Sequence, residues 1–148
     1  CLKRSEADIR RLNALGVRVR LVKGAYKEPR TVAYQQKSEV DAAFVDLTRL
    51  LMDEGTYPAI ATHDPAMIES AKAYAKGKGY GSDRFEFQML YGVRRDLQEQ
   101  LVQSGCRMRV YIPFGTQWYP YLMRRLAERP ANIAFILGNI VKESVPGL

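Results

Sequence analysis

The chain has 148 residues, 47% hydrophobic and 26% charged, which is the composition of a single globular domain spanning 1–148. No apolar run reaches the roughly 20 residues of a membrane-spanning helix, and the net charge of +7, mixed with acidic residues, argues against specific nucleic-acid binding. Cys1 and Cys106 suit neither a disulfide scaffold nor a metal site, and His63 is the only histidine, so we expect no metal and a reducing interior.

The first predicted elements are a helix over 5–15, capped by Ser5, and a strand over 17–22. The helix has an apolar stripe and is followed by a glycine that suits its end. The strand alternates, so that one face is apolar and the other carries Arg18 and Arg20. The stripe of the helix is formed by Ile9, Leu12 and Leu15.

The second unit begins with a predicted helix over 38–54, whose apolar residues recur at helical spacing. A short apolar strand over 58–62 follows. Asp64 and Pro65 then give an N-cap and a proline at the first helical position, and the glycines of 77–79 are expected to break this third helix. Its predicted buried stripe consists of Met67, Ile68, Ala71 and Ala75.

The remaining chain continues the same alternation of strands and helices, with an apolar tail that we expect to be helical. The predicted elements are a strand over 85–90, a helix over 93–104, a strand over 108–113, a helix over 118–127 and the tail over 130–148. Strands separated by helices favour a parallel sheet, because parallel pairing needs a long crossover. A closed eight-stranded barrel needs at least about 200 residues. The sheet is therefore either open and doubly wound or half of a barrel.

Residues for chemistry are expected at the strand ends, where parallel α/β folds place their sites. Arg20 is either a solvated strand end or a guanidinium inside a barrel. Lys23 and Gly24 lie in a turn whose backbone could hold a phosphate. His63 follows the second strand, and it is either a hydrogen-bonded structural residue or a catalyst. Three tyrosines at strand ends could line a flat ligand or simply pack at the rim, namely Tyr26, Tyr91 and Tyr111.

Two neighbouring arginines, Arg124 and Arg125, lie in the last predicted helix. Neighbours on a helix point about 100° apart, so the pair cannot form one flat face. They could approach one anion from two directions, or they could belong to a solvated basic face in which Arg124 pairs with Glu128. The residues alone leave both interpretations open.

Five stretches in series resemble the proline dehydrogenase family, in family order and over nearly the whole chain. They are 20–26 (RLVKGAY), 61–63 (ATH), 85–92 (FEFQMLYG), 111–115 (YIPFG) and 121–128 (YLMRRLAE). The similarity is to the single-function bacterial type rather than to the long bifunctional protein. It implies an α/β fold of parallel strands alternating with helices, in which this chain supplies the last four βα units of a (βα)₈ TIM-like barrel.

The resemblance also implies an activity, which is FAD-dependent oxidation of L-proline to Δ¹-pyrroline-5-carboxylate in proline catabolism. Electrons would pass to a membrane quinone, which implies a cytoplasmic protein at the inner face of the cell membrane, and a homo-oligomer is compatible with it. Arg20 resembles the catalytic arginine beside flavin N5. The implied FAD-binding residues are Arg20, Val22, Lys23, Gly24, Ala25, Thr62, His63, Gln88 and Glu128. The implied proline-binding residues are Tyr26, Leu90, Tyr111, Arg124 and Arg125.

One departure from the family pattern limits this expectation. The family's N-terminal strands supply a lysine, an aspartate and a flavin-contacting glutamine that this sequence does not contain. We therefore expect weak or absent FAD binding by the chain alone. The alternative hypothesis is a non-catalytic open α/β module that binds a ligand or a partner.

Overall fold

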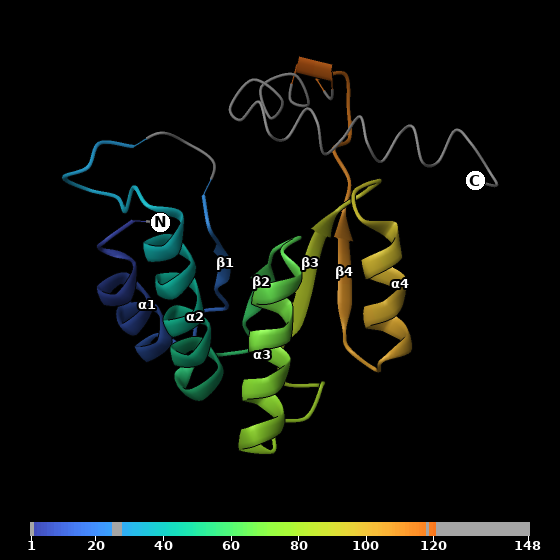
Figure 1. Cartoon of the computed structure of the whole chain (residues 1–148), viewed down its shortest axis with the longest axis horizontal. Helices are drawn as coiled ribbons and strands as arrows, with labels where there is room; N and C mark the ends of the chain where they lie inside the picture. Colours follow the sequence, from blue (N-terminus) through green and yellow to red (C-terminus); the bar gives the residue numbers. More distant parts are fainter. Residues whose placement is uncertain (1, 25–27, 118, 121–148) are drawn as a thin grey trace.

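The computed structural model describes residues 2–24, 28–117 and 119–120 (Figure 1). The predicted tail over 130–148 lies outside these residues, as does the predicted helix over 118–127 except for 119–120. Within the described part, helices and strands alternate as expected. In chain order they are α1 (Ser5–Ala14), β1 (Arg20–Val22), α2 (Lys37–Glu54), β2 (Ala59–Ala61), α3 (Pro65–Lys78), β3 (Glu86–Leu90), α4 (Arg95–Gln103) and β4 (Met108–Tyr111).

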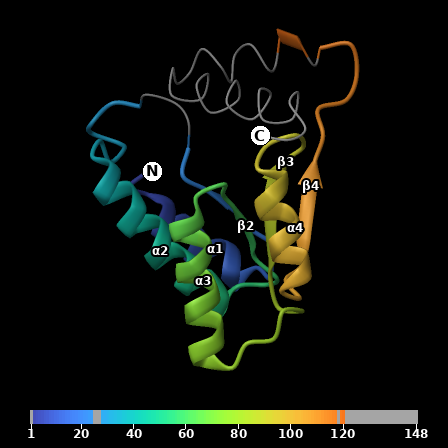
Figure 2. The same cartoon turned by 45° about the vertical axis from the view of Figure 1, so that its right-hand side comes forward.

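The four described strands form one parallel sheet in the order β1-β2-β3-β4. Parallel crossovers are almost always right-handed, so strands that follow one another in chain order carry their connecting helices on the same face. Figures 1 and 2 show α2, α3 and α4 arranged in this way, with α1 beside α2. A doubly wound sheet reverses its strand order and has helices on both faces. The strand order therefore agrees with the half-barrel and excludes the doubly wound alternative.

The register divides the strand residues between two faces. Leu21, Ile60 and Phe87 are aligned across β1, β2 and β3 and are all buried. They pack with apolar residues of the helices, among them Phe44 and Leu51, in one hydrophobic core. We call the opposite face, which is turned away from α2, α3 and α4, the inner face of the sheet.

The start and end of α3 follow the sequence signals closely. The Asp64 side chain accepts a hydrogen bond from the backbone N–H of Ala66, and Pro65 is the first helical residue. Gly79 ends the helix with φ of +70°, a conformation that glycine adopts without steric cost. All members of the predicted stripe are buried, namely Met67, Ile68, Ala71 and Ala75.

Some local predictions for the first unit were wrong. Arg4 rather than Ser5 is the N-cap of α1, and its side chain makes no capping hydrogen bond. Leu15 is 75% exposed and does not belong to the buried stripe. The first strand begins at Arg20 rather than at residue 17, because the Val17 N–H is bonded to the Leu12 carbonyl at the end of the helix.

The later strands are also shorter than predicted, and α3 continues through Gly77 to Lys78 instead of breaking there. A single glycine lowers helix propensity by only about 1 kcal/mol, and the buried stripe of α3 outweighs that loss. Of the helices in the described ranges, none combines the length and apolar character that crossing a membrane requires.

Candidate active site on the inner face of the sheet

Polar side chains occupy the inner face of three of the four strands. The register aligns Arg20 of β1 with Glu86 of β3, and Gln88 of β3 with Arg109 of β4. Parallel sheets covered on both faces have strands that are apolar throughout. The alternation of polar and apolar residues in β3 therefore marks a face with a different role from the core.

Four of these side chains form a continuous hydrogen-bonded chain across the sheet. Arg20 Nε donates to Gln88 Oε1 at 2.7 Å, and Gln88 Nε2 donates to Glu86 Oε1 at 2.6 Å. Arg109 donates from Nε and Nη2 to the two oxygens of Glu86, at 2.6 and 2.8 Å. The Arg20 guanidinium carbon also lies 5.1 Å from the centre of the Tyr111 ring, within the range of a cation–π contact.

Glu86 is the anchor of this chain and is only 5% exposed. The hydrogen bonds from Arg109 hold the pKa of Glu86 at about 2, with a further contribution from Gln88, although burial opposes the shift. Two parallel N–H donors on one carboxylate make the strongest type of charge-assisted pair. Glu86 is therefore ionised and fixed in orientation at neutral pH.

His63 connects the ends of β2 and β3. Its Nε2 accepts a hydrogen bond from the backbone N–H of Leu90 at 3.0 Å. Burial lowers the pKa of His63 to about 4, and the positive charges of Arg94 and Arg20 add to the shift. The ring is therefore neutral at pH 7, and because Nε2 is the acceptor, the proton lies on Nδ1. The sequence left His63 open as either a hydrogen-bonded structural residue or a catalyst. The hydrogen bond from the Leu90 N–H is the contact that a structural role requires.

Lys23 faces the helices rather than the inner face. Its ammonium group pairs with Asp41 of α2 and, at 2.7 Å, with Asp64 at the start of α3. Burial alone would raise the pKa of Asp64, but hydrogen bonds from Lys23 and from the Ala66 N–H outweigh it and leave that pKa below its usual value. Gly24 follows with φ of +87°. The pairing of Lys23 thus ties the end of β1 to two helices.

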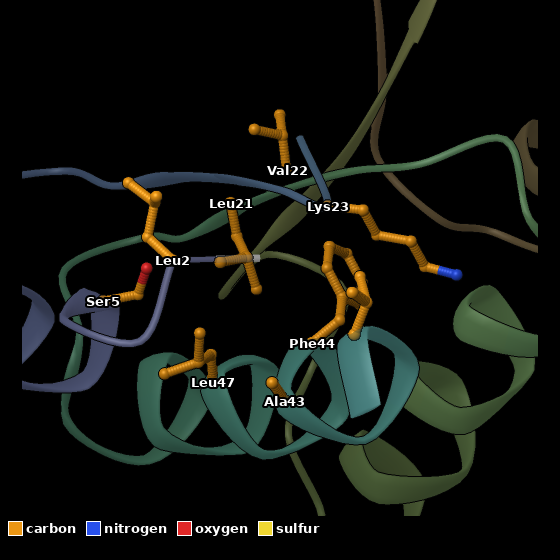
Figure 3. A pocket seen from close by; sticks show the side chains of 9 residues that line it. Leu2, Ser5, Leu21, Val22, Lys23, Ala43, Phe44 and Leu47 are labelled. Atoms are coloured by element: carbon orange, nitrogen blue, oxygen red, sulfur yellow. The ribbon is translucent and has the colours of Figure 1, made fainter. Parts of the chain in front are cut away.

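A small pocket lies beside Lys23, between β1 and α2 (Figure 3). Leu21, Phe44 and Leu47 are among the residues that line it, and Val22 points away from α2 in the same view. The pocket is therefore on the core side of the sheet and is separate from the polar chain on the inner face.

The structure brings together several residues that the sequence placed at the site. Arg20 and Gln88 are directly bonded, and Tyr111 lies against Arg20. Val22 is 41% exposed at the end of β1. The side chain of the buried Thr62 accepts a hydrogen bond from the Asp64 N–H. The remaining expected site residues, Ala25, Tyr26, Arg124, Arg125 and Glu128, lie outside the described residues.

Sequence reasoning missed two members of the polar chain, Glu86 and Arg109. A signal was present, because Glu86 and Gln88 alternate with Phe87 and Met89 in the sequence. That alternation places two polar residues on one face of a strand that should be buried on both sides. Arg109 occupies the matching face of the next strand.

Comparison with known proteins identifies the chain at the level of its family. Residues 2–137 match the family described as Proline dehydrogenase. The chain is 51% identical over 142 residues to "Proline dehydrogenase 2" of Bacillus subtilis strain 168, covering 96% of the chain and 47% of the relative. It is 48% identical over 141 residues to "Proline dehydrogenase" of Deinococcus radiodurans, covering 95% of the chain and 46% of the relative. The chain thus spans about half the length of the curated relatives it matches.

Solved structures give the same result for the fold. A proline utilization A (PutA) structure from Bdellovibrio bacteriovorus, described as inactivated by N-propargylglycine, superposes with a TM-score of 0.78 at 31% identity, covering 84% of the chain and 15% of that protein. A bifunctional PutA structure gives a TM-score of 0.77 at 30% identity, covering 98% of the chain and 17% of that protein.

These matches define the fold class first, since the parallel sheet with its outer helices is of the TIM-barrel type. The chain belongs to the proline dehydrogenase family. Its identity to the shorter relatives exceeds the 32% found for the bifunctional PutA of Rhizobium meliloti, in agreement with the single-function bacterial type.

Proposed function

We propose that this chain forms the carboxyl-terminal four βα units of an FAD-dependent proline dehydrogenase. The reaction removes two electrons and two protons from L-proline and forms the C=N bond of Δ¹-pyrroline-5-carboxylate. Membership of the family and the half-barrel topology support this assignment. The observation that carries it is the guanidinium of Arg20, held on the inner face of the sheet by Gln88 and Tyr111.

The donor set on the inner face fits a flavin. An electron-rich reduced flavin is favoured by a fixed positive charge, and Arg20 provides one whose Nε is already bonded to Gln88. FAD, when bound, supplies the electron acceptor of the reaction. Within the proposal, the flavin is held by Arg20, Val22 and Gln88 on the inner face, and by the turn around Lys23, Gly24 and Ala25, with Thr62, His63 and Glu128.

Proline itself is assigned to the residues that the family resemblance implies for it. Arg124 and Arg125 bind its carboxylate, because paired guanidinium groups make strong charge-assisted hydrogen bonds to such an anion. Tyr26, Leu90 and Tyr111 surround the apolar part of the ring. Among these, Leu90 is buried and its N–H is bonded to His63, so the strand end that presents Leu90 is held in place. The task of the residues is to orient the substrate against the cofactor.

The proposal has three further parts. They are a membrane quinone as the final electron acceptor, peripheral association with the inner face of the cell membrane, and formation of a homo-oligomer. They follow from the family resemblance. A test is proline-dependent reduction of a soluble quinone analogue, followed by sedimentation with and without lipid vesicles.

The function is tested best by completing the protein with a relative. A chimera joins this chain to the part of the Bacillus subtilis relative that the chain does not match. We expect the purified chimera to be yellow and its flavin absorbance to bleach when L-proline is added. The intact relative serves as the positive control. A chimera that binds FAD but is not reduced by proline, while the relative is reduced, would contradict the proposal.

A further inference from the structure

We propose that Glu86 and Arg109 are positioning residues that orient the guanidinium of Arg20 through the side-chain amide of Gln88. Neither residue is required by the proposed function as stated above. The inference rests on that function only in its last step, that the oriented guanidinium serves the oxidation of proline. The orienting chain itself can be tested on the protein without any ligand.

The direction of the hydrogen bonds carries the argument. Ionised Glu86 can only accept hydrogen bonds, so the Gln88 amide must turn its NH₂ group toward it. The amide oxygen then faces the opposite way, toward Arg20, whose Nε can only donate. If the amide were flipped, its NH₂ group would face another donor. The charge of Glu86 therefore selects the one amide orientation that binds Arg20.

Arg109 fixes the carboxylate that makes this selection. Its two donors contact both oxygens of Glu86, at 2.6 and 2.8 Å, so the carboxylate plane is set as well as its charge. A buried carboxylate without such a partner would become protonated or would destabilise the fold. Because the pair holds the pKa of Glu86 at about 2, the orientation is maintained throughout the physiological pH range.

The intervening strand is shaped to let Arg20 reach its partner. Arg20 lies on β1 and Gln88 on β3, so the hydrogen bond passes over β2, a lateral span of about 10 Å between strand axes. The inner-face residues of β2 aligned with these strands are Ala59 and Ala61, which are short enough to leave the long arginine side chain room.

The hydrogen bond that Arg20 makes within the described part of the protein leaves its terminal amino groups available. Among the described residues, the hydrogen bond recorded for Arg20 uses Nε, while the Tyr111 ring lies 5.1 Å from the guanidinium carbon. Nε is thus the atom through which the protein orients the Arg20 guanidinium. The hydrogen bonds of Glu86 and Arg109 described above join them to each other and to Gln88. They therefore act on Arg20 through Gln88, as positioning residues rather than catalytic ones.

The first experiment measures the orienting chain directly in the 148-residue protein. The Arg20 Nε–H signal is assigned in a ¹⁵N–¹H spectrum by its disappearance in Arg20→Lys, and its exchange with water is recorded. We expect Glu86→Gln to accelerate that exchange by about tenfold or more, since a neutral amide at position 86 can donate as well as accept and no longer fixes the orientation of the Gln88 amide. The matched control is Glu99→Gln, at an exposed position on α4, which should leave the exchange unchanged.

A second comparison tests the route through Gln88. Gln88→Leu should accelerate the Arg20 Nε–H exchange to a similar extent, and adding Glu86→Gln to that variant should produce little further change. If Glu86→Gln does not unfold the protein and leaves the exchange unaltered, the proposal is wrong. If it acts equally in the Gln88→Leu background, the route through the amide is wrong. Should Glu86→Gln fail to fold, Arg109→Lys, which keeps the charge but loses the two-pronged contact, replaces it with the same expected acceleration.

The last step is tested in the chimera with the Bacillus subtilis relative. Glu86→Gln there should lower kcat about tenfold while changing the proline KM little, because the carboxylate of proline is assigned to other residues. An unchanged kcat, together with accelerated exchange at Arg20, would overturn the link to catalysis. If the unsubstituted chimera shows no proline oxidation at all, the proposed function fails, and the exchange measurement still decides whether Glu86 orients Arg20.

Discussion

The lowered pKa of His63 predicts that acid destabilises this fold in a specific pH window. The pKa of His63 is lowered to about 4 in the folded chain, against 6.5 for an ordinary histidine, chiefly by burial. Between these two values the unfolded chain binds a proton that the folded chain does not. The free energy of unfolding must therefore fall as the pH decreases from 6.5 to 4, and the loss ends below pH 4.

The size of the effect follows from the two pKa values. Linkage gives a loss of about 1 kcal/mol between pH 7.0 and 5.5, and about 3 kcal/mol over the whole window. His63 is the only histidine in the chain, so no other side chain has its ordinary pKa between pH 5.5 and 7.0. Most carboxylates titrate below pH 5.5. A loss of stability above that pH can therefore be assigned to His63.

The assay is urea unfolding at pH 7.0, 6.25 and 5.5, compared between the wild-type chain and His63→Gln. The glutamine oxygen can accept the Leu90 N–H as the imidazole nitrogen does, but it does not titrate in this range. We expect the pH-dependent loss in the wild type and a nearly flat profile in the variant. Equal slopes for the two proteins would refute the argument, because the loss would then arise elsewhere.

Three further predictions concern packing, the helix start and the substrate. Ile60→Ala should lower the free energy of unfolding in urea by about 2 to 5 kcal/mol, because its side chain is fully buried, whereas Leu15→Ala, at 75% exposure, should change it by less than about 0.5 kcal/mol. Asp64→Ala should cost about 1 to 2 kcal/mol by removing the cap of α3 and the partner of Lys23, and Asp64→Asn should cost less because it keeps the cap; equal losses would contradict this reasoning. In the chimera, Arg125→Met should raise the proline KM strongly with FAD still bound, and an unchanged KM would remove the carboxylate assignment.

The order of elements could be predicted because each signal was local. Asp64 and Pro65 specify the start of α3, and the spacing of its apolar residues specifies which side is buried. Local signals failed where a neighbouring segment competed for the same backbone groups. Val17 has a strand-like sequence, but its N–H is used to end α1, so the strand starts only at Arg20.

The arrangement of the site was harder to predict than its location. The sequence placed Arg20 and Gln88 at the ends of different strands, and the parallel register brings them into contact. Lys23 directly follows the strand that carries Arg20, yet its side chain faces the helices, where it pairs with Asp41 and Asp64. Which face a residue takes at the end of a strand depends on partners far away in the sequence, and no local pattern encodes them.

The polar chain on the inner face is best understood as a unit whose members depend on one another. Glu86 is buried and is tolerated because Arg109 contacts both of its oxygens. Gln88 gains a defined orientation from Glu86, and Arg20 gains its acceptor from Gln88. Removing any one of these four side chains leaves a neighbour with an unmatched polar group. The loss of unfolding free energy from two substitutions among them should therefore be smaller than the sum of the two single losses. This dependence also explains why the sequence alone left two interpretations of Arg20 open. A solvated arginine and a positioned arginine differ only in the side chains that the other strands place beside them.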